Sequence, residues 1–156
     1  MATQLTEHFT LEEMCKSDTA VRKGIDNLTT DETIISYLRS VCAHILEPVR
    51  ENFGIPFAPT SGYRCPALNA AVNGSSRSQH CKGQTADIEL AGVDNFVLAD
   101  WIESNCTYDQ LILEYYKSGE PSSGWVHVSY IQPEVGQNRK NSITFDGNTY
   151  QAGLIK

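Results

Sequence analysis

A histidine and an aspartate seven positions apart are the first residues whose types and spacing could do chemistry. His80 and Asp87 flank Gly83, and Asp87 lies in an alternating, strand-like pattern. A loop followed by a strand can bring such a pair to one metal ion. His127, in the segment GWVHVSY, is the third candidate ligand. Two histidines and one carboxylate leave zinc one position for water, as in catalytic zinc sites, so the pattern predicts metal-assisted hydrolysis.

Motifs around these residues follow one another through most of the chain. They are FTLEEM at 9–14, LEPVRENFG at 46–54, SGYRCPALNAAVNG at 61–74, SQHCKGQTADI at 78–88, QLILE at 110–114 and WVHVSY at 125–130. In this order, residues 9–130 resemble the zinc D-alanyl-D-alanine carboxypeptidase family of peptidoglycan peptidases, in the branch common among bacteriophage endolysins. Hedgehog signalling domains resemble the same fold. The resemblance implies cleavage of amide bonds in the peptidoglycan stem peptide, with Zn2+ as the cofactor, although Mn2+ or Co2+ can replace it in vitro.

Glu114, at the end of QLILE, is the candidate general base. Residues 110–116 and 125–131 have the pattern of two strands joined by the loop KSGEPSSG. If this loop closes symmetrically, Glu114 lies directly opposite His127, with the side chains about 5 Å apart. A slip of the register by one residue would undo this arrangement. The carboxylate could then move a proton from water to the leaving amine. The alternative is a carboxylate that only orients a metal ligand.

Two positions depart from part of the wider family. Several relatives carry an acidic base three residues before the last histidine, and some carry another histidine two residues before it. This chain has Gly124 and Trp125 at those places. The assignment of Glu114 as the base therefore depends on the resemblance of QLILE to the branch in which a strand glutamate is available.

Arg64 and Ser78 are the candidate substrate-binding residues. A guanidinium can hold a carboxylate through two hydrogen bonds, and the resemblance implies that Arg64 contacts a carboxylate or carbonyl of the wall peptide. Its alternative role is a surface salt bridge. Ser78 matches the family's serine two residues before the first ligand, where it contacts substrate or only steadies the loop. Thr85 replaces the alanine usual in the motif, and we expect it to tighten the site without touching the metal.

The first half of the chain predicts helices. Thr10 and Glu13 form a capping box for a short helix, and residues 31–53 carry apolar side chains at three- and four-residue steps. Pro48 is expected to bend or divide this long helix. Residues 55–61 are β-prone and interrupted by proline, which indicates an edge strand.

The second half predicts a sheet. A short helix over 66–71 precedes residues 85–90, which alternate so that Asp87 lies on the polar face. Asp94 caps an amphipathic helix that runs to about residue 104. Its predicted buried residues are Val97, Leu98, Trp101 and Ile102. Asp146 and Gly147 signal a hairpin that extends the sheet. Helices followed by a mainly antiparallel sheet predict one α+β peptidase domain over residues 1–156, with 131–156 as a C-terminal hairpin extension.

Composition narrows the possible partners. The chain has 156 residues, is 40% apolar and carries a net charge of −7, without a cluster of Lys and Arg. These values fit one folded domain and argue against binding to nucleic acid or to anionic membranes. The absence of C-x-x-C pairs among the five cysteines predicts reduced thiols. Cys81 is an alternative zinc ligand, but neighbouring residues in an extended loop point apart.

Several functions stay open at this stage. The enzyme could be a carboxypeptidase that removes terminal D-Ala or an endopeptidase that cuts within the stem or cross-bridge. A noncatalytic wall-binding or virion-structural module and a regulatory zinc domain are the alternatives. The N-terminus has no pattern of a secretion signal and no apolar run is long enough for a membrane span. We therefore expect a monomer that is made in the host bacterial cytoplasm and acts on the cell wall after release.

Overall fold

The N-terminal part of the structure is helical, as the sequence predicts. The computed structural model describes residues 2–156, and its first helices are α1 (Leu11–Cys15) and α2 (Asp18–Lys23). The predicted capping box opens α1, because the Thr10 hydroxyl accepts from the Glu13 N–H and the Glu13 carboxylate accepts from the Thr10 N–H. The sequence patterns do not predict α2, which is capped by the Ser17 hydroxyl.

The long predicted helix is divided just before Pro48. It consists of α3 (Glu32–Val41), the π-helical turn η1 (Cys42–Leu46) and α4 (Glu47–Phe53). In η1 the Glu47 N–H donates to the Cys42 carbonyl, five residues back. Pro48 has no N–H with which to continue the α-helical hydrogen bonds. The widened turn accommodates this gap, so the apolar stripe continues across it.

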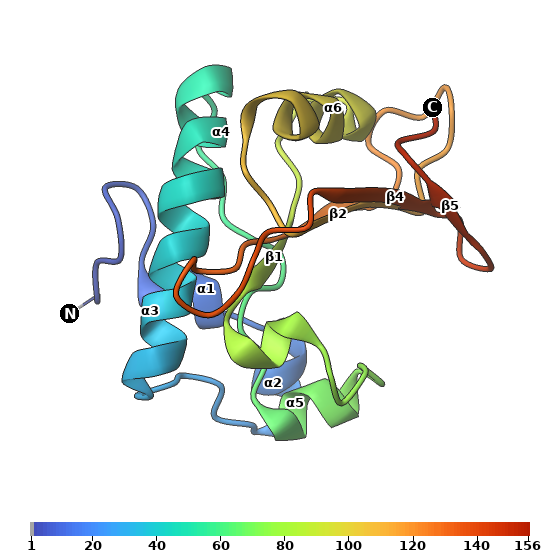
Figure 1. Cartoon of the computed structure of the whole chain (residues 1–156). Coiled ribbons are helices and arrows are strands. Elements are labelled where there is room, and N and C mark those ends of the chain that lie inside the picture. Colours follow the sequence, from blue (N-terminus) through green and yellow to red (C-terminus); the bar gives the residue numbers. More distant parts are fainter. Residues whose placement is uncertain (1) are drawn as a thin grey trace.

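Five strands form one sheet in the order β1-β3-β2-β4-β5. Their bounds are β1 (Thr85–Ile88), β2 (Gln110–Glu114), β3 (Trp125–Ser129), β4 (Asn141–Phe145) and β5 (Tyr150–Ala152). All neighbouring strands are antiparallel except β2 and β4, which are parallel. The predicted hairpin around Asp146 and Gly147 supplies β4 and β5 at one edge of the sheet (Figure 1). The predicted α+β class with a mainly antiparallel sheet is confirmed.

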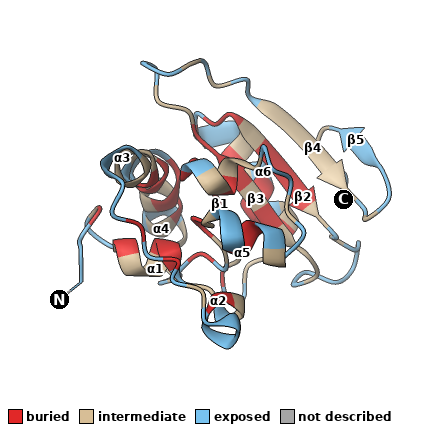
Figure 2. Ribbon diagram, turned by 90° about the horizontal axis from the view of Figure 1, so that it is seen from below, coloured by how far each residue is buried: buried red, intermediate tan, exposed pale blue. Residues whose placement is uncertain are grey.

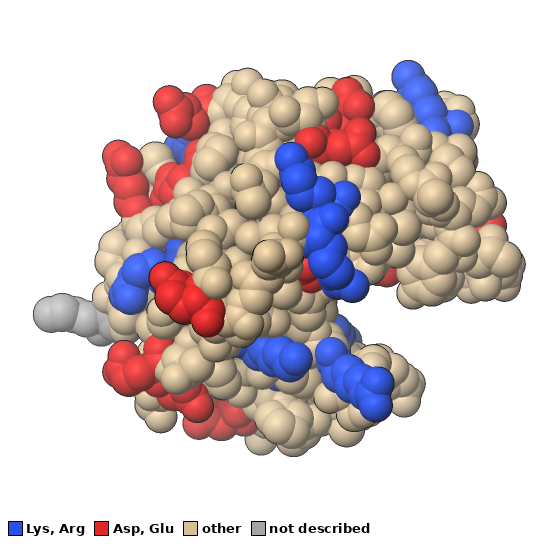
Figure 3. Space-filling view, in the orientation of Figure 1, with Lys and Arg blue, Asp and Glu red and all other residues tan. Residues whose placement is uncertain are grey.

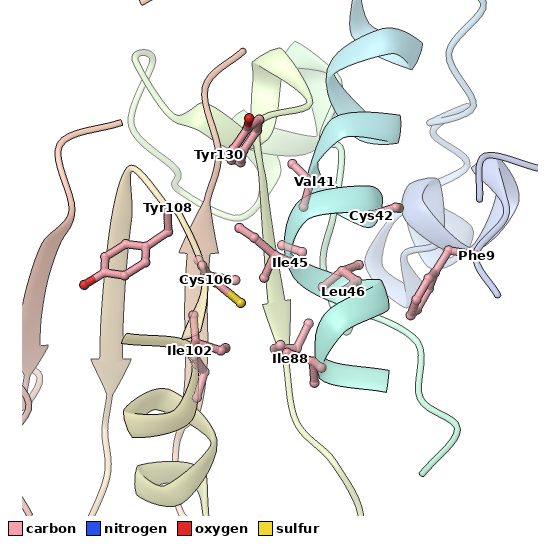
Figure 4. Close-up of a cluster of buried hydrophobic side chains, with 14 of the residues drawn as sticks. Phe9, Val41, Cys42, Ile45, Leu46, Ile88, Ile102, Cys106, Tyr108 and Tyr130 are labelled. Carbon is pink, nitrogen blue, oxygen red and sulfur yellow. The ribbon is translucent and has the colours of Figure 1, made fainter. Parts of the chain in front are cut away.

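One face of the sheet carries the hydrophobic core. Alternate residues of β1, β3 and β2 are fully buried on this face, namely Ala86, Ile88, Leu111, Leu113, Val126 and Val128. The continuous helix α3-η1-α4 and α6 (Asn95–Asn105) cover it (Figure 1). Figure 4 shows Ile45 and Leu46 of η1 directed toward Ile88 of β1. Asp94 caps α6 as predicted, but Val97 is 47% exposed, so its predicted place in the core is wrong.

The opposite face is only partly covered. The short helix α5 (Pro66–Ala71) and the 3-10 turn η2 (Gln79–Lys82) lie below it at the β1 end. Away from β1 the strands become less buried, and β5 is exposed along its length (Figure 2). This face of the sheet is therefore covered at its β1 edge and open to solvent at its β5 edge. Within residues 2–156, no helix combines the length and apolar character needed to cross a bilayer.

The predicted edge strand over residues 55–61 does not form. The segment is irregular and touches the sheet at a single bridge, where the Asp87 N–H donates to the Ser61 carbonyl (2.8 Å) and the Thr60 N–H donates to the Asp87 carbonyl (2.9 Å). Pro56 and Pro59 each lack the N–H that a strand ladder would use. The segment therefore holds β1 only at the position of Asp87.

Candidate metal centre and active site

The three predicted metal ligands meet on the partly covered face of the sheet. His80 comes from η2, Asp87 from β1 and His127 from β3. Asp87 and His127 are direct cross-strand partners. One ligand atom from each of the three residues lies within 4.8 Å of the other two. Residues that are far apart in the sequence thus form one cluster that could bind a metal ion.

The orientation of the His80 ring is fixed by the backbone carbonyl of Gly62. The ring is buried, and Nδ1 lies 2.7 Å from the carbonyl oxygen of Gly62. A carbonyl can only accept, so Nδ1 carries the proton and Nε2 keeps its lone pair. Nε2 lies 3.5 Å from Oδ2 of Asp87. His80 therefore presents a metal-binding nitrogen toward the carboxylate, supported by the hydrogen-bonded outer partner typical of such ligands.

The orientation of His127 is fixed by Thr85. The Thr85 hydroxyl donates to the Val128 carbonyl (2.7 Å), which uses its only proton. Its oxygen lies 3.2 Å from Nε2 of His127 and can then only accept there. The proton of neutral His127 is therefore on Nε2, and Nδ1 faces Oδ1 of Asp87 at 2.9 Å. Thr85 thus tightens the site, as its place in the motif predicts, by contacting a candidate ligand directly.

Three electron-pair donors consequently converge on one point. Two imidazole nitrogens and a carboxylate facing one another repel unless a cation lies between them, either protons on the rings or a metal ion. Burial alone would raise the pKa of the Asp87 carboxyl. In the metal-free protein, hydrogen bonds from the protonated rings of His127 and His80 outweigh burial and hold this pKa below the usual range. The donor set of two nitrogens and one oxygen fits zinc and leaves a position for a further ligand.

Cys81 is not part of this cluster. The metal-binding group found within residues 2–156 consists of His80, Asp87 and His127 alone. Cys81 follows His80 on the 3-10 turn η2, not in the extended loop that the sequence suggested. All five cysteines are free thiols, in agreement with the prediction of reduced cysteines.

Glu114 shares the sheet face of the metal cluster, but not by the predicted pairing. It lies opposite Trp125, whereas His127 lies opposite Ile112. The predicted register is therefore wrong by two residues. The shift leaves Glu114 on the correct face because side chains of a strand alternate with a period of two. Glu114 is thus a diagonal neighbour of His127: its direct partner Trp125 lies two residues before His127 on β3.

The Glu114 carboxylate is held by its strand neighbour. The indole Nε1–H of Trp125 donates to Oε2 at 2.6 Å. Burial raises the pKa of the Glu114 carboxyl, with the charge of Asp87 adding to the effect and that of His127 opposing it. A carboxylate with a raised pKa beside a metal cluster is suited to accept and return a proton near neutral pH.

A pocket of about 660 Å³ opens over the cluster. Its lining includes His80, Asp87 and His127 together with Glu114 and Arg64. Figure 3 shows this side of the molecule hollowed between the lower helices and the sheet, with Lys and Arg side chains on both sides of the hollow. An acidic protein thus concentrates positive charge around its candidate site, which favours an anionic substrate group.

Arg64 and Ser78 lie together at the wall of this pocket. The Ser78 hydroxyl accepts from the His80 N–H (3.2 Å), so it caps η2 and steadies the ligand loop. Arg64 Nη2 lies 3.4 Å from the same hydroxyl. Within residues 2–156 the Arg64 guanidinium forms no salt bridge, and its buried Nε has no hydrogen-bond partner. The predicted alternative of a surface salt bridge is absent, which leaves the guanidinium available for a ligand.

The sequence does not predict an ion pair that supports the pocket wall, between buried Asp109 and the pocket residue Arg139. Asp109 is fully buried and accepts from Arg139 Nε (2.9 Å), Arg139 Nη2 (2.8 Å) and Gln79 Nε2 (3.1 Å). These contacts join η2 to the start of β2 and to the segment before β4. A buried aspartate is stable as an anion only when it is paired in this way. Arg139 follows no recognised motif, so no local signal marked it.

One family model matches most of the chain. It is described as Peptidase M15 and covers residues 7–129, which includes all six site residues predicted from the sequence. No curated protein matches the chain.

Proposed function

Because the chain belongs to the peptidase M15 family, whose members are zinc-dependent, we propose that it hydrolyses amide bonds in peptidoglycan stem peptides. The observation that carries this proposal is the convergence of His80 Nε2, Asp87 and His127 Nδ1 at the floor of an open pocket. Each imidazole is held in the tautomer that presents a lone pair to the same point. Because the rings are already oriented, no further free energy is needed to reorganise them when substrate binds.

The side chains of the site have separate roles in metal binding and in proton transfer. His80, Asp87 and His127 would hold Zn2+, which when bound makes water a stronger acid and polarises a carbonyl. Glu114 accepts the proton of the attacking water and delivers it to the amine that leaves, so no free hydroxide or free amide anion has to form. The Trp125 N–H holds Oε2 of Glu114, and Oε1 has no hydrogen bond within residues 2–156. One carboxylate oxygen therefore remains for the transferred proton.

Arg64 is proposed to bind a substrate carboxylate. Its guanidinium lines the same pocket and is not paired with any protein carboxylate in the described part of the chain. Stem peptides offer the terminal carboxylate of D-Ala and the side carboxylate of D-Glu. Both a carboxypeptidase and an endopeptidase are therefore compatible with this contact. Ser78 positions the loop and stands within reach of the same ligand.

The physiological role is proposed from the motif order. The motifs between residues 9 and 130 resemble the branch common among phage endolysins. We propose a monomeric lysis enzyme that is made in the host bacterial cytoplasm and reaches the cell wall when the membrane is breached. The stem peptide is its expected partner, and the acidic net charge of −7 gives no attraction to nucleic acid.

Digestion of purified wall sacculi tests this function. The protein is incubated with sacculi in the presence and absence of a metal chelator, and released fragments are identified by mass. We expect new amino termini that disappear with chelator and return with Zn2+. His80→Ala is expected to be inactive, and Glu114→Gln should lose about a hundredfold or more in kcat. Binding to sacculi without release of fragments would instead identify a noncatalytic wall-binding module.

A further inference from the structure

The sheet face that carries the metal cluster continues beyond it as a row of aromatic side chains. Trp125 pairs with Glu114 across β3 and β2, Glu114 pairs with Phe145 on β4, and Phe145 pairs with Tyr150 on β5. This row lies two residues along the strands from the row that contains Asp87 and His127. Adjacent strands are about 4.8 Å apart, so the row starts beside the candidate base and extends away from the metal cluster.

The rings of this row contact one another through Tyr115. Its ring lies 5.1 Å from Trp125 and 5.5 Å from Phe145, measured between centroids. Phe145 in turn stacks on Tyr150 at 4.3 Å. We call these four residues the aromatic platform. Tyr115 is 43% exposed and Tyr150 is 61% exposed, so the platform presents open ring surface and is not a closed core.

The backbone conformation of Tyr115 places its ring on the platform. Its φ is +57°, a left-handed conformation that a bulky residue rarely adopts. A regular strand would turn residue 115 toward the core face, because Glu114 already points to the pocket face. The left-handed turn brings the Tyr115 ring to the pocket side instead, where Gly147 leaves space for it. Strain of this kind is maintained in places where a side chain serves a ligand.

The composition of the platform defines what it can bind. Apart from Glu114, the row carries no charge, and the arginines of the pocket (Arg64, Arg77 and Arg139) are not part of it. The hydroxyls of Tyr115 and Tyr150 make no hydrogen bond to protein within residues 2–156. Flat apolar rings bordered by free hydroxyls match a ligand that has a flat C–H face and polar edges. A pyranose ring has this chemistry, whereas the stem peptide offers mainly methyl groups, amides and carboxylates.

We propose that the aromatic platform is a subsite for a sugar ring of the glycan strand to which the cleaved peptide is attached. This proposal rests on the proposed function and goes beyond it, because it assigns a carbohydrate-binding role to residues outside the reacting groups. Tyr115, Trp125 and Tyr150 line the same pocket as Glu114 and His127. One substrate molecule can therefore occupy the platform and the metal cluster together.

Two matched substrates test the platform. One is a disaccharide-linked stem peptide, and the other is the same peptide without sugar. We expect the wild-type protein to have the higher kcat/KM on the sugar-linked substrate. Tyr150→Ala should lower that value roughly five- to tenfold through KM and leave cleavage of the free peptide unchanged. Tyr150→Phe should retain most of the preference, and Tyr37→Ala, an aromatic substitution on α3 outside the pocket, should leave both substrates unaffected.

The outcomes separate this inference from the proposed function. Equal losses on both substrates, or no wild-type preference, would overturn the sugar subsite while the peptidase stands. If the wild-type protein cuts neither substrate, the proposed function fails, and binding of an N-acetylated tetrasaccharide is then measured by calorimetry. Binding that Tyr150→Ala weakens would support the subsite independently of catalysis. Absence of sugar binding in that case would overturn it.

Discussion

The hydroxyl oxygen of Thr85 lies 3.2 Å from Nε2 of His127, and its own proton is already donated to the Val128 carbonyl. This relationship fixes which nitrogen of His127 is free. We expect Thr85→Ala to weaken zinc affinity about 10- to 100-fold, the usual effect of losing such an outer partner. Competition with a chromophoric chelator measures this affinity without reference to catalysis.

Two further substitutions at Thr85 separate the hydrogen bond from packing. Thr85→Val keeps the volume but removes the acceptor, so it should weaken zinc binding as Thr85→Ala does. Thr85→Ser keeps the hydroxyl and should stay close to wild type. Wild-type affinity in Thr85→Val would show that the contact is packing alone.

The half-buried position of Glu114 predicts a pH-dependent stability. Burial raises the pKa of this carboxyl in the folded metal-free protein. A raised folded pKa contributes stability below the unfolded value of about 4.3, and this contribution is lost as pH rises through the folded pKa. Glu114→Gln cannot ionise, so the variant should be more stable than wild type at pH 7 and equal to it near pH 4. Urea unfolding with chelator present tests this, and a difference that is independent of pH would contradict it.

Trp125 is expected to act through Glu114. Trp125→Phe keeps an aromatic ring but removes the N–H that donates to Oε2 at 2.6 Å. Hydrogen bonds to charged groups contribute about 1.5–3 kcal/mol, so we expect kcat to fall roughly 10- to 100-fold. In a Glu114→Ala background the same substitution should have little further effect. Additive losses in this double-mutant cycle would mean that Trp125 acts on the reaction independently of Glu114.

Gly62 is expected to tolerate no side chain. A Cβ at this position would collide with the backbone carbonyl of Met14, and the Gly62 carbonyl is the acceptor for His80 Nδ1. Gly62→Ala should therefore cost about 1–3 kcal/mol of unfolding free energy and also weaken zinc binding. Gly136→Ala, where a Cβ meets only ordinary contacts, is the matched control. Unchanged zinc affinity in a folded Gly62→Ala protein would contradict the role of its carbonyl.

The sequence predicts the features that depend on local periodicity. The capping box of α1, the division of the long helix before Pro48, the alternation around Asp87 and the hairpin around Asp146 all follow from residues close together in the chain. The three candidate ligands were identified because their types and motif context are distinctive. Side chains on one strand face stay together even when the pairing shifts by two residues, which is why Glu114 still reaches the pocket.

The features that the sequence does not predict depend on contacts between distant segments. The hairpin between β2 and β3 shifts because the left-handed residues Tyr115 and Gly124 end the strands at Glu114 and Trp125. A tyrosine gives no local signal for this conformation, unlike a glycine. The parallel pairing of β2 with β4 and the acceptor roles of Thr85 and Gly62 also arise only when the chain is folded.

The central claim is that one zinc ion is held by two imidazoles and one carboxylate on an open sheet face. Anomalous diffraction at the zinc edge from crystals of the zinc-loaded protein tests it most directly. We predict one peak about 2.0–2.2 Å from His80 Nε2, an Asp87 oxygen and His127 Nδ1, with the remaining position open to the pocket beside Glu114. A zinc ion bound elsewhere, or enclosed by four protein ligands, would contradict this account of the site.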